Sequence, residues 1–311
     1  MKKPTHIRNV AVLYGGFSKE REISLVSGSA AARALEAKGL TVTRIDVMRD
    51  VSELARAIST AKPDVAFNAL HGRWGEDGCI QGLLDMMAVP YTNSGQLASA
   101  MAMDKPTAKR VFAAAGIPVA EEKIITVAEA EKSDVMARPY VLKPFNEGSS
   151  VGVKIVQAGS NRPPLDDLGL AQDDLIMAER FIPGREVTVA VMGANMEARP
   201  LAVTEITTAR GFYDYEAKYA KGGSQHILPA QLPKKLYDQA MELSLTAHRA
   251  LGCRGVSRAD LRLDGETFFM LEVNTQPGLT PTSLVPEQAA YVGMSFEDLM
   301  FWMVEHAQCD A

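Results

Sequence analysis

Residues 255–284, GVSRADLRLDGETFFMLEVNTQPGLTPTSL, gather acidic, amide and basic side chains on two stretches that otherwise have the pattern of buried strands. In residues 256–263 and again in residues 267–274, polar and apolar side chains alternate, which predicts two strands with one apolar and one polar face. The polar faces are expected to carry Arg258, Asp260 and Arg262 on the first strand and Glu272 and Asn274, together with Met270, on the second.

The Asp-Gly pair at residues 264–265 predicts that these strands form a hairpin. A two-residue loop would place Asp260 and Glu272 on opposite faces, because side chains alternate along a strand. A three-residue loop over residues 264–266 instead pairs Arg258 with Glu272 and leaves Asp260 diagonal to it. We therefore predict the three-residue loop.

Asp260, Glu272 and Asn274 would then lie close enough to share a cation, since diagonal neighbours are about 7 to 8 Å apart. All three offer oxygen ligands, and no His or Cys is near them in the sequence. This favours a hard cation such as Mg²⁺ over zinc. The alternative is that Arg258, Asp260 and Glu272 form an ordinary salt-bridge ladder on a solvated face.

The composition is typical of a globular chain with a large core. The chain has 311 residues, of which 47% are hydrophobic and 23% charged. Its formal net charge of −5 argues against a nucleic-acid partner, whose binding face is usually basic. The 3 cysteines are widely spaced, which fits reduced thiols rather than a disulfide framework or a metal site. Because we find no signal peptide and no membrane span, we expect a cytoplasmic protein that acts on small molecules.

Strands and helices alternate over the first part of the chain, which predicts a parallel sheet with helices on its faces. Ligands of such sheets bind beyond the carboxyl ends of the strands, where the loops GGFSKEREIS (15–24) and HGRWGEDG (71–78) are expected. By itself, Glu20 fits a solvated charge run that leads into a helix better than a site residue, and His71 fits a loop histidine bonded to backbone. The expected elements are strands over residues 10–14, 40–46 and 65–70, and helices over residues 24–39 and 51–59.

The pattern changes near Asp104, where we place a domain boundary. Asp104 is expected to cap a helix that runs to Ala115. Beyond it, the loop FNEGSS joins strands expected over residues 140–144 and 151–156. The small residues of this loop, with Lys143 just before them, suit a flap over a polyphosphate, although a plain hairpin would look the same.

Two later features suit a nucleotide site. Glu179 and Glu186 can bond an adenine amino group and ribose hydroxyls, or can simply be solvated on edge strands. Residues 203–229 lack clear periodicity but contain the aromatic cluster FYDYEAKY, so we predict a lid whose Lys218 and Tyr219 reach inward on closure. The remaining expected elements are strands over residues 175–181 and 186–192 and helices over residues 233–251 and 295–307.

Together these loops resemble the D-alanine:D-alanine ligases of the ATP-grasp superfamily over nearly the whole chain. The motifs that carry the resemblance are GGFSKEREISLVSG, ALHGRWGEDG, MDK, VLKPFNEGSSVGV, FYDYEAKY, GVSRADLRLD and LEVNTQPGLTPTSLVP. The resemblance implies an α/β protein, α+β in its ATP-binding part, in which an N-terminal parallel-sheet domain precedes central and C-terminal domains that sandwich ATP. The implied domains are residues 1–103 for substrate binding, 104–185 with the flap, and 186–311 with the lid and the metal site.

The resemblance also implies roles for individual residues. The implied ATP-binding residues are Lys105, Lys143, Ser149, Ser150, Glu179, Arg180, Phe181, Ile182, Glu186, Lys218 and Asn274. The implied ligands of two Mg²⁺ ions, for which Mn²⁺ can substitute, are Asp260, Glu272 and Asn274. The implied D-alanine-binding residues are Glu20, His71, Arg258, Gly278, Ser283 and Leu284. The implied catalytic residues are Glu20, Ser149, Tyr219, Arg258 and Gly278.

The implied reaction is the ATP-dependent ligation of two D-alanines through an acyl phosphate, for peptidoglycan precursor synthesis in the bacterial cytoplasm. The resemblance further implies a homodimer, with K⁺ as a candidate activator. The Lys218-Tyr219 pair favours a dipeptide product over a D-alanine:D-lactate product. Rival hypotheses are a non-catalytic nucleotide-binding protein and another ATP-grasp carboxylate–amine ligase. A dehydrogenase is disfavoured, because Gly15-Gly16 lacks the spacing of a dinucleotide fingerprint.

Overall fold

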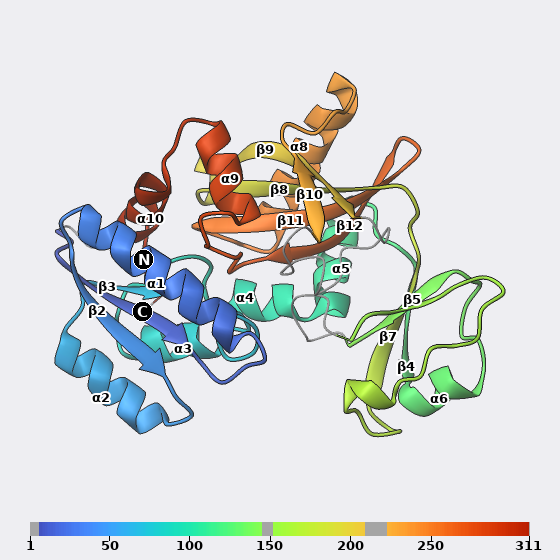
Figure 1. The fold of residues 1–311 in the computed structure, drawn as a ribbon, viewed down its shortest axis with the longest axis horizontal. Coiled ribbons are helices and arrows are strands. Elements are labelled where there is room, and N and C mark those ends of the chain that lie inside the picture. Colours follow the sequence, from blue (N-terminus) through green and yellow to red (C-terminus); the bar gives the residue numbers. More distant parts are fainter. Residues whose placement is uncertain (1–5, 145–151, 209–222, 311) are drawn as a thin grey trace.

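The computed structural model describes residues 6–144, 152–208 and 223–310. In this part of the chain the strands form three sheets, which Figure 1 shows as separate units along the long axis of the molecule. The strand orders are β2-β1-β3, β4-β7-β5-β6 and β10-β9-β8-β11-β12. This mixed α/β architecture has the parallel and antiparallel parts that the sequence predicted.

The first sheet is parallel, as predicted from the alternation of strands and helices. Side chains of β1 alternate between two buried layers, with Val12 facing the side of α1 and α10 and Leu13 the side of α2 and α3. This burial explains why β1 is a short apolar run, whereas the edge strand β2 is more polar and more exposed. Its elements are β1 (Asn9–Gly15), α1 (Arg21–Ala37), β2 (Thr41–Val47), α2 (Val51–Ala61), β3 (Val65–Asn68), α3 (Cys79–Met86) and α4 (Gln96–Met103).

The last described residues extend this first sheet. Tyr91 bridges to Ala66 of β3, and Gln308 in turn bridges to Tyr91, with backbone N···O distances of 3.0 and 3.1 Å in the two directions. Next to this bridge, Arg254 donates a hydrogen bond of 2.6 Å to Asp310. The chain therefore returns at its end to the sheet with which it begins, and Figure 1 shows the two ends near each other.

The second sheet lies at the opposite end of the molecule and is antiparallel. The helix that leads to it is capped as predicted, because the Asp104 carboxylate accepts the Thr107 N–H at 2.9 Å. The strand expected over residues 151–156 is shorter than predicted. The elements of this part are α5 (Lys105–Ala114), β4 (Glu122–Thr126), α6 (Val127–Lys132), β5 (Tyr140–Lys143), β6 (Lys154–Val156), the 3-10 turn η1 (Asp166–Leu168) and β7 (Leu175–Arg180).

The third sheet is antiparallel and packs one apolar face against α8 and α5. Val189 of β8 and Leu261 of β11 belong to this core together with Ala240 of α8 and Phe112 of α5. The other face of β11 carries the polar residues of the candidate site. The elements are β8 (Arg185–Met192), the 3-10 turn η2 (Asn195–Glu197), β9 (Arg199–Thr208), β10 (Ser224–Ile227), α8 (Lys234–Ala250), β11 (Val256–Asp264), β12 (Thr267–Asn274), α9 (Leu284–Tyr291) and α10 (Phe296–Glu305).

The predicted register of the β11–β12 hairpin is wrong. Asp264 pairs with Thr267, so the loop has the two-residue length that we rejected. A β-bulge between Asp260 and Leu261 then shifts the register, and Asp260 faces Glu272 directly rather than diagonally. The bulge also places Met270 in the core rather than beside Glu272, so the predicted unbroken alternation of β12 is interrupted.

Two other boundaries differ from prediction. The segment over residues 203–229 is not irregular throughout, because β9 extends to Thr208 and pairs with β10. Helix α1 begins at Arg21, three residues before the expected start, so Glu20 occupies its N-cap position. The charge run at residues 20–22 is therefore the start of a helix, in which Glu20 is only 5% exposed.

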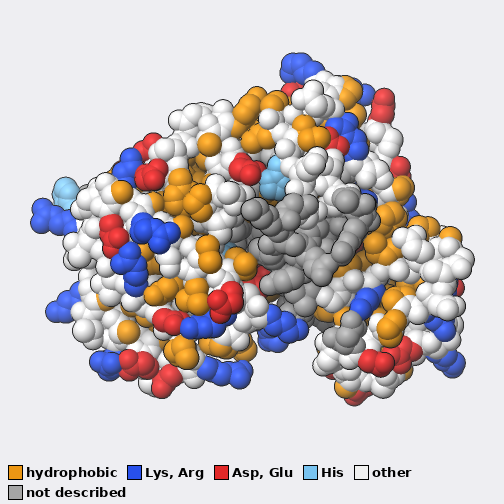
Figure 2. Space-filling model, viewed as in Figure 1, with side chains coloured by type: hydrophobic (Ala, Val, Ile, Leu, Met, Phe, Trp, Pro, Cys, Tyr) orange, Lys and Arg blue, Asp and Glu red, His pale blue; other side chains and the backbone are white. Residues whose placement is uncertain are grey.

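No helix in the described part of the chain is long and apolar enough to cross a membrane. Figure 2 shows Lys and Arg side chains interspersed with Asp and Glu over the face that it presents. This distribution agrees with the modest net charge of −5, and the face shown carries no extended basic patch of the kind that binds nucleic acid.

Candidate active site

The polar face of β11 and β12 brings the three predicted metal ligands together. Asp260 lies opposite Glu272 in the ladder, and Asn274 donates its side-chain amide to Asp260 at 3.2 Å. Arg258 forms a bidentate pair with Asp260, at 2.9 and 2.7 Å. This pair lies within one strand, whereas the alternative hypothesis places the salt bridges across the two strands.

Thr188 supports this cluster and was missed by sequence reasoning. Its hydroxyl, on the neighbouring strand β8, lies 2.6 Å from Asp260 Oδ1 and 3.2 Å from the Ala259 carbonyl. The hydroxyl can donate its proton to the carboxylate and so fix the orientation of the Asp260 side chain. A lone threonine inside a buried strand carries no sequence signal that would have revealed this role.

The candidate metal set fits a hard cation by its donor chemistry. Asp260 and Glu272 supply carboxylate oxygens and Asn274 an amide oxygen, which are the ligands that Mg²⁺ prefers. In the described part of the chain, no group of three or more His, Cys, Asp or Glu side chains is arranged to hold a metal. An ion bound here would therefore complete its shell with oxygens from outside the protein, which Mg²⁺ does readily with phosphate and water.

Lys105 joins this cluster from the start of α5. Its ammonium nitrogen lies 3.4 Å from Glu272 Oε2. A small cleft beside them is lined by Glu76 from the loop after β3, by Lys105 and by Glu272 and Asn274. The cleft brings together the predicted phosphate lysine, two of the three predicted metal ligands and the loop that contains His71.

A second predicted lysine, Lys143, lies in a buried charge cluster on the second sheet. Its ammonium donates to Glu179 Oε2 at 2.6 Å, and Glu179 is only 3% exposed. Burial raises the pKa of Glu179, but the neighbouring ammonium groups of Lys143 and Lys109 lower the pKa by more, so the carboxylate is ionised.

The predicted adenosine-binding residues around β7 and β8 are held by Arg262, a residue to which we had given no role. Its guanidinium donates to Glu186 Oε2 at 2.8 Å and to the Ile182 carbonyl at 3.2 Å, and it lies over the Phe181 ring at 5.5 Å. The Arg180 guanidinium lies 5.0 Å from the ring centre of Phe269 on β12. Arg262 thus contacts Phe181, Ile182 and Glu186 of the predicted set, whereas Glu179 is held by lysines.

Glu20 and His71 meet where the first sheet ends, as predicted from their two loops. A Cβ atom on Gly72 would lie 2.5 Å from Glu20 Oε2, so the Glu20 carboxylate packs directly against the loop after His71. The ring nitrogens of His71 lie 3.1 Å from Glu76 Oε1 and 3.1 Å from Ser27 Oγ, and the backbone of Gln276 is a further hydrogen-bond partner of this histidine. Burial lowers the pKa of His71, but the carboxylates of Glu76 and Glu20 raise it by more.

Gly278 and Ser283 are also neighbours. A Cβ on Gly278 would lie 3.2 Å from Ser283 Oγ, and that oxygen accepts the Thr280 N–H at 3.1 Å. Ser283 is the N-cap residue of α9, and Leu284 is buried against Ile206. The start of a helix is a suitable site for a substrate carboxylate, since its free N–H groups point outward.

Gln276 connects this loop to the first sheet and was also missed. Its amide donates to the Asn68 carbonyl at 2.7 Å, and its oxygen accepts from Asn93 at 2.7 Å. Both partners are buried, so the loop that carries Gly278 is fixed against the carboxyl end of β3.

Four predicted site residues, Ser149, Ser150, Lys218 and Tyr219, lie outside the described residues.

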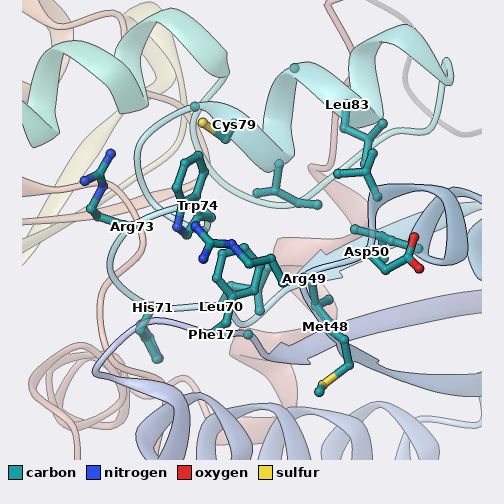
Figure 3. A pocket seen from close by; sticks show the side chains of 18 of the residues that line it. Phe17, Met48, Arg49, Asp50, Leu70, His71, Arg73, Trp74, Cys79 and Leu83 are labelled. Atoms are coloured by element: carbon teal, nitrogen blue, oxygen red, sulfur yellow. The ribbon is translucent and has the colours of Figure 1, made fainter.

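A larger cavity of about 460 Å³ lies against the same two N-terminal loops. Figure 3 shows Phe17 and Trp74 side by side in its wall, with Arg49 close to both. The Phe17 and Trp74 ring centres are 5.8 Å apart, and Arg73 lies 5.1 Å from the Trp74 ring. Since Gly16 and His71 line it too, the cavity shares walls with the loops that carry Glu20 and His71.

The fold and the site together define an ATP-grasp ligase. The family model described as "D-ala D-ala ligase C-terminus" matches residues 111–305, and that described as "D-ala D-ala ligase N-terminus" matches residues 46–94. The D-alanine–D-alanine ligase of Rhodospirillum rubrum is 59% identical over 98% of this chain and 99% of its own length. That of Paramagnetospirillum magneticum is 57% identical over 97% of this chain and 99% of its own length.

Solved structures agree with this relationship. The crystal structure of D-alanine–D-alanine ligase from Bacillus anthracis complexed with ATP matches with a TM-score of 0.77 and 26% identity, covering 96% of this chain and 97% of that one. The chain therefore belongs to the D-alanine–D-alanine ligase family, and it is an enzyme that uses ATP.

Proposed function

We propose that this chain joins two molecules of D-alanine into D-alanyl-D-alanine, with conversion of ATP to ADP and phosphate, as a step in peptidoglycan precursor synthesis. The observation that carries the proposal is the cleft where Lys105, Glu272 and Asn274 meet the loop that contains His71. This cleft suits the phosphorylation of a carboxylate, because it brings a phosphate-binding lysine, the ligands for a hard cation and an amino-acid site within reach of one another.

The first chemical step requires a carboxylate to become a good acyl donor. A carboxylate oxygen of the first D-alanine attacks the γ-phosphorus of ATP, the bond to the β-phosphate oxygen breaks, and ADP leaves an acyl phosphate behind. Glu20 holds the ammonium of this D-alanine, with His71 beside it, so that the carboxylate points toward the phosphate. Lys105 and Lys143 bind phosphate oxygens and offset their negative charge.

Asp260, Glu272 and Asn274 would hold Mg²⁺, or Mn²⁺ in its place. When bound, such ions would withdraw negative charge from the phosphoryl oxygens and so make the γ-phosphorus easier to attack. The proposed number is two, with K⁺ as a candidate activator.

The second step forms the peptide bond. The second D-alanine, oriented by its carboxylate at Ser283 and Leu284, attacks the acyl carbon with its free amine, and phosphate leaves. Arg258 and the Gly278 N–H stabilise the oxyanion that forms at the acyl oxygen. Ser149, Ser150, Lys218 and Tyr219 are proposed to close over the acyl phosphate and exclude water, with Tyr219 bonded to Glu20 and Ser149.

We propose that residues 1–103, 104–185 and 186–311 form the three domains of this enzyme, that it acts in the cytoplasm, and that it is a homodimer. The sheet boundaries support the domain division, because each proposed domain contains one of the three sheets almost entirely. Light scattering of the purified protein tests the dimer.

The decisive experiment measures phosphate release from ATP with D-alanine, L-alanine, D-serine and D-lactate as separate substrates. We expect rapid release with D-alanine, much slower release with the others, and D-alanyl-D-alanine as the product by mass spectrometry. Absence of release with D-alanine would refute the proposed substrate. A matched variant, Tyr219→Phe, is expected to slow dipeptide formation, and full activity in that variant would refute the proposed closure.

A further inference from the structure

Lys109 is a buried cation that has no role in the proposed reaction. It lies one helical turn after Lys105 on α5 and is only 2% exposed. Its ammonium donates to Glu179 Oε1 at 2.6 Å and to the Ala120 carbonyl at 2.8 Å. Glu122 Oε2 lies 2.7 Å from the same nitrogen as an ion-pair partner. A lysine is rarely buried so completely unless its charge is paired with an opposite charge.

Glu179 is shared by two lysines in this structure. Lys109 takes one carboxylate oxygen, and Lys143 takes the other at 2.6 Å. In the described part of the chain, the charged groups that face Glu179 are Lys109 from α5, Lys143 from β5 and Glu122 from β4, which pairs with Glu179 in the sheet. The two ammonium groups keep the carboxylate ionised in spite of its burial.

The two lysines differ in how firmly they are held. Lys109 is fixed by a backbone carbonyl and a second carboxylate in addition to Glu179. Lys143 stands at the end of β5, separated by one residue from the loop FNEGSS, and its ion-pair partner among the described residues is Glu179. Under the proposed function, on which this inference rests, Lys143 turns to the phosphates of ATP, whose several negative charges compete with a single carboxylate.

We propose that Lys109 is a positioning residue of the ATP site, which holds Glu179 ionised and in place while Lys143 engages the phosphates. With Lys109 present, Glu179 keeps one full hydrogen-bonded charge partner after Lys143 has turned away, and it remains an acceptor for the adenine amino group. Without Lys109, either Glu179 retains Lys143 and withholds it from the phosphates, or Glu179 must take up a proton when ATP binds.

The loss of Lys109 should therefore make ATP binding depend on pH. Lys109→Met keeps the length of the side chain and removes its charge. We expect this variant to raise the KM for ATP by about thirtyfold or more near pH 8, the scale of losing one partner of a buried charge pair. The increase in KM should become smaller toward pH 6, where a proton on Glu179 replaces the charge of the missing ammonium. The kcat should change less than the KM. Arg110→Gln, an exposed neighbour on the same helix, is the matched control and should leave KM unchanged at every pH.

Calorimetry with the non-hydrolysable analogue AMP-PNP provides a second readout that requires no D-alanine. Titrations in two buffers of different ionisation enthalpy count the protons taken up on binding. We expect almost none for the parent protein and up to about one for Lys109→Met. Should Lys109→Met not fold, the double variant Lys109→Met/Glu179→Gln takes its place and should bind AMP-PNP as tightly as Glu179→Gln alone.

A KM increase that is the same at all pH values overturns the role of Lys109, and so does AMP-PNP binding by Lys109→Met that is as tight as the parent's and takes up no proton. Weaker binding by the double variant than by Glu179→Gln alone overturns it too. The proposed function fails separately, if the parent protein binds AMP-PNP but releases no phosphate with D-alanine.

Discussion

Acidification should weaken the strand that carries Arg258 and Asp260, because a buried histidine lies under it. His248 of α8 is fully buried, and its Nδ1 lies 2.7 Å from the hydroxyl of Ser257, the residue before Arg258 on β11. Its Nε2 lies 3.3 Å from the Gly193 carbonyl, which can only accept, so Nε2 carries the proton and Nδ1 accepts from Ser257.

The magnitude follows from the pKa of this histidine. Burial lowers the pKa of His248 from 6.5 to about 4, since the apolar surroundings disfavour the charged ring. At about 1.4 kcal/mol for each pKa unit, the folded state loses about 3 kcal/mol relative to the unfolded state once the pH lies below both values. The contribution is complete above about pH 6.5 and declines as the pH falls, because the unfolded chain then binds a proton that the folded chain excludes.

Urea unfolding followed by circular dichroism at a series of pH values measures this effect. The comparison is between the parent protein and His248→Gln, which cannot titrate but keeps a donor and an acceptor. Carboxylates contribute equally to both proteins, so the difference between their unfolding free energies isolates His248. We expect the parent to lose about 2 kcal/mol more than the variant between about pH 7.5 and pH 5. Parallel curves would refute the reasoning.

Three further predictions concern the site and its support. Asp260→Asn should reduce phosphate release at least about a hundredfold while the circular dichroism spectrum stays unchanged, and undiminished turnover would remove Asp260 from the metal set. The raised pKa of His71 means that its ion pair with Glu76 is complete below about pH 6.5 and is lost as the pH rises through the folded pKa. His71→Gln should therefore flatten the pH dependence of the KM for D-alanine in that window, and an unchanged profile would contradict this role. Gln288→Leu removes the acceptor at 2.8 Å from the Ala190 N–H in the β8 bulge and should cost about 2 kcal/mol in urea unfolding, whereas a midpoint equal to the parent's would show that the amide finds another partner.

The first sheet could be predicted from sequence because its strands and helices are defined by patterns among residues that are close together in the chain. The strands β1 and β3 are short apolar runs, and strands alternate with helices in this part of the chain, so a parallel sheet was predicted, although the order β2-β1-β3 was not. The cap at Asp104 was predicted for the same reason, since a helix start needs an acceptor for its first N–H groups.

The hairpin register could not be predicted, because four apolar residues occur in succession at residues 268–271. Such a run fits either face of a strand and hides the bulge that restores Asp260 and Glu272 to one side. Asp260 and Glu272 face each other although the predicted loop was wrong, because the bulge compensates for the shorter turn.

The sequence analysis also missed buried polar side chains whose partners lie on other elements of the fold. Lys109 follows Lys105 by one helical turn, and a lysine in that position normally belongs to a solvated helix face. Its burial depends on Glu122 from the next strand, β4, and on Glu179 from β7, which comes much later in the chain. Thr188 and Gln276 were missed for the same reason, since each is defined by a partner that only the folded chain brings near.

The bridge between Tyr91 and Gln308 has a consequence for the order of assembly. A ribosome makes β1, β2 and β3 early, but the backbone that bonds the outer side of Tyr91 emerges only after the ATP-binding sheets have been made. Until then this edge faces water or a foreign strand. The first sheet to be synthesised is thus among the last to be completed.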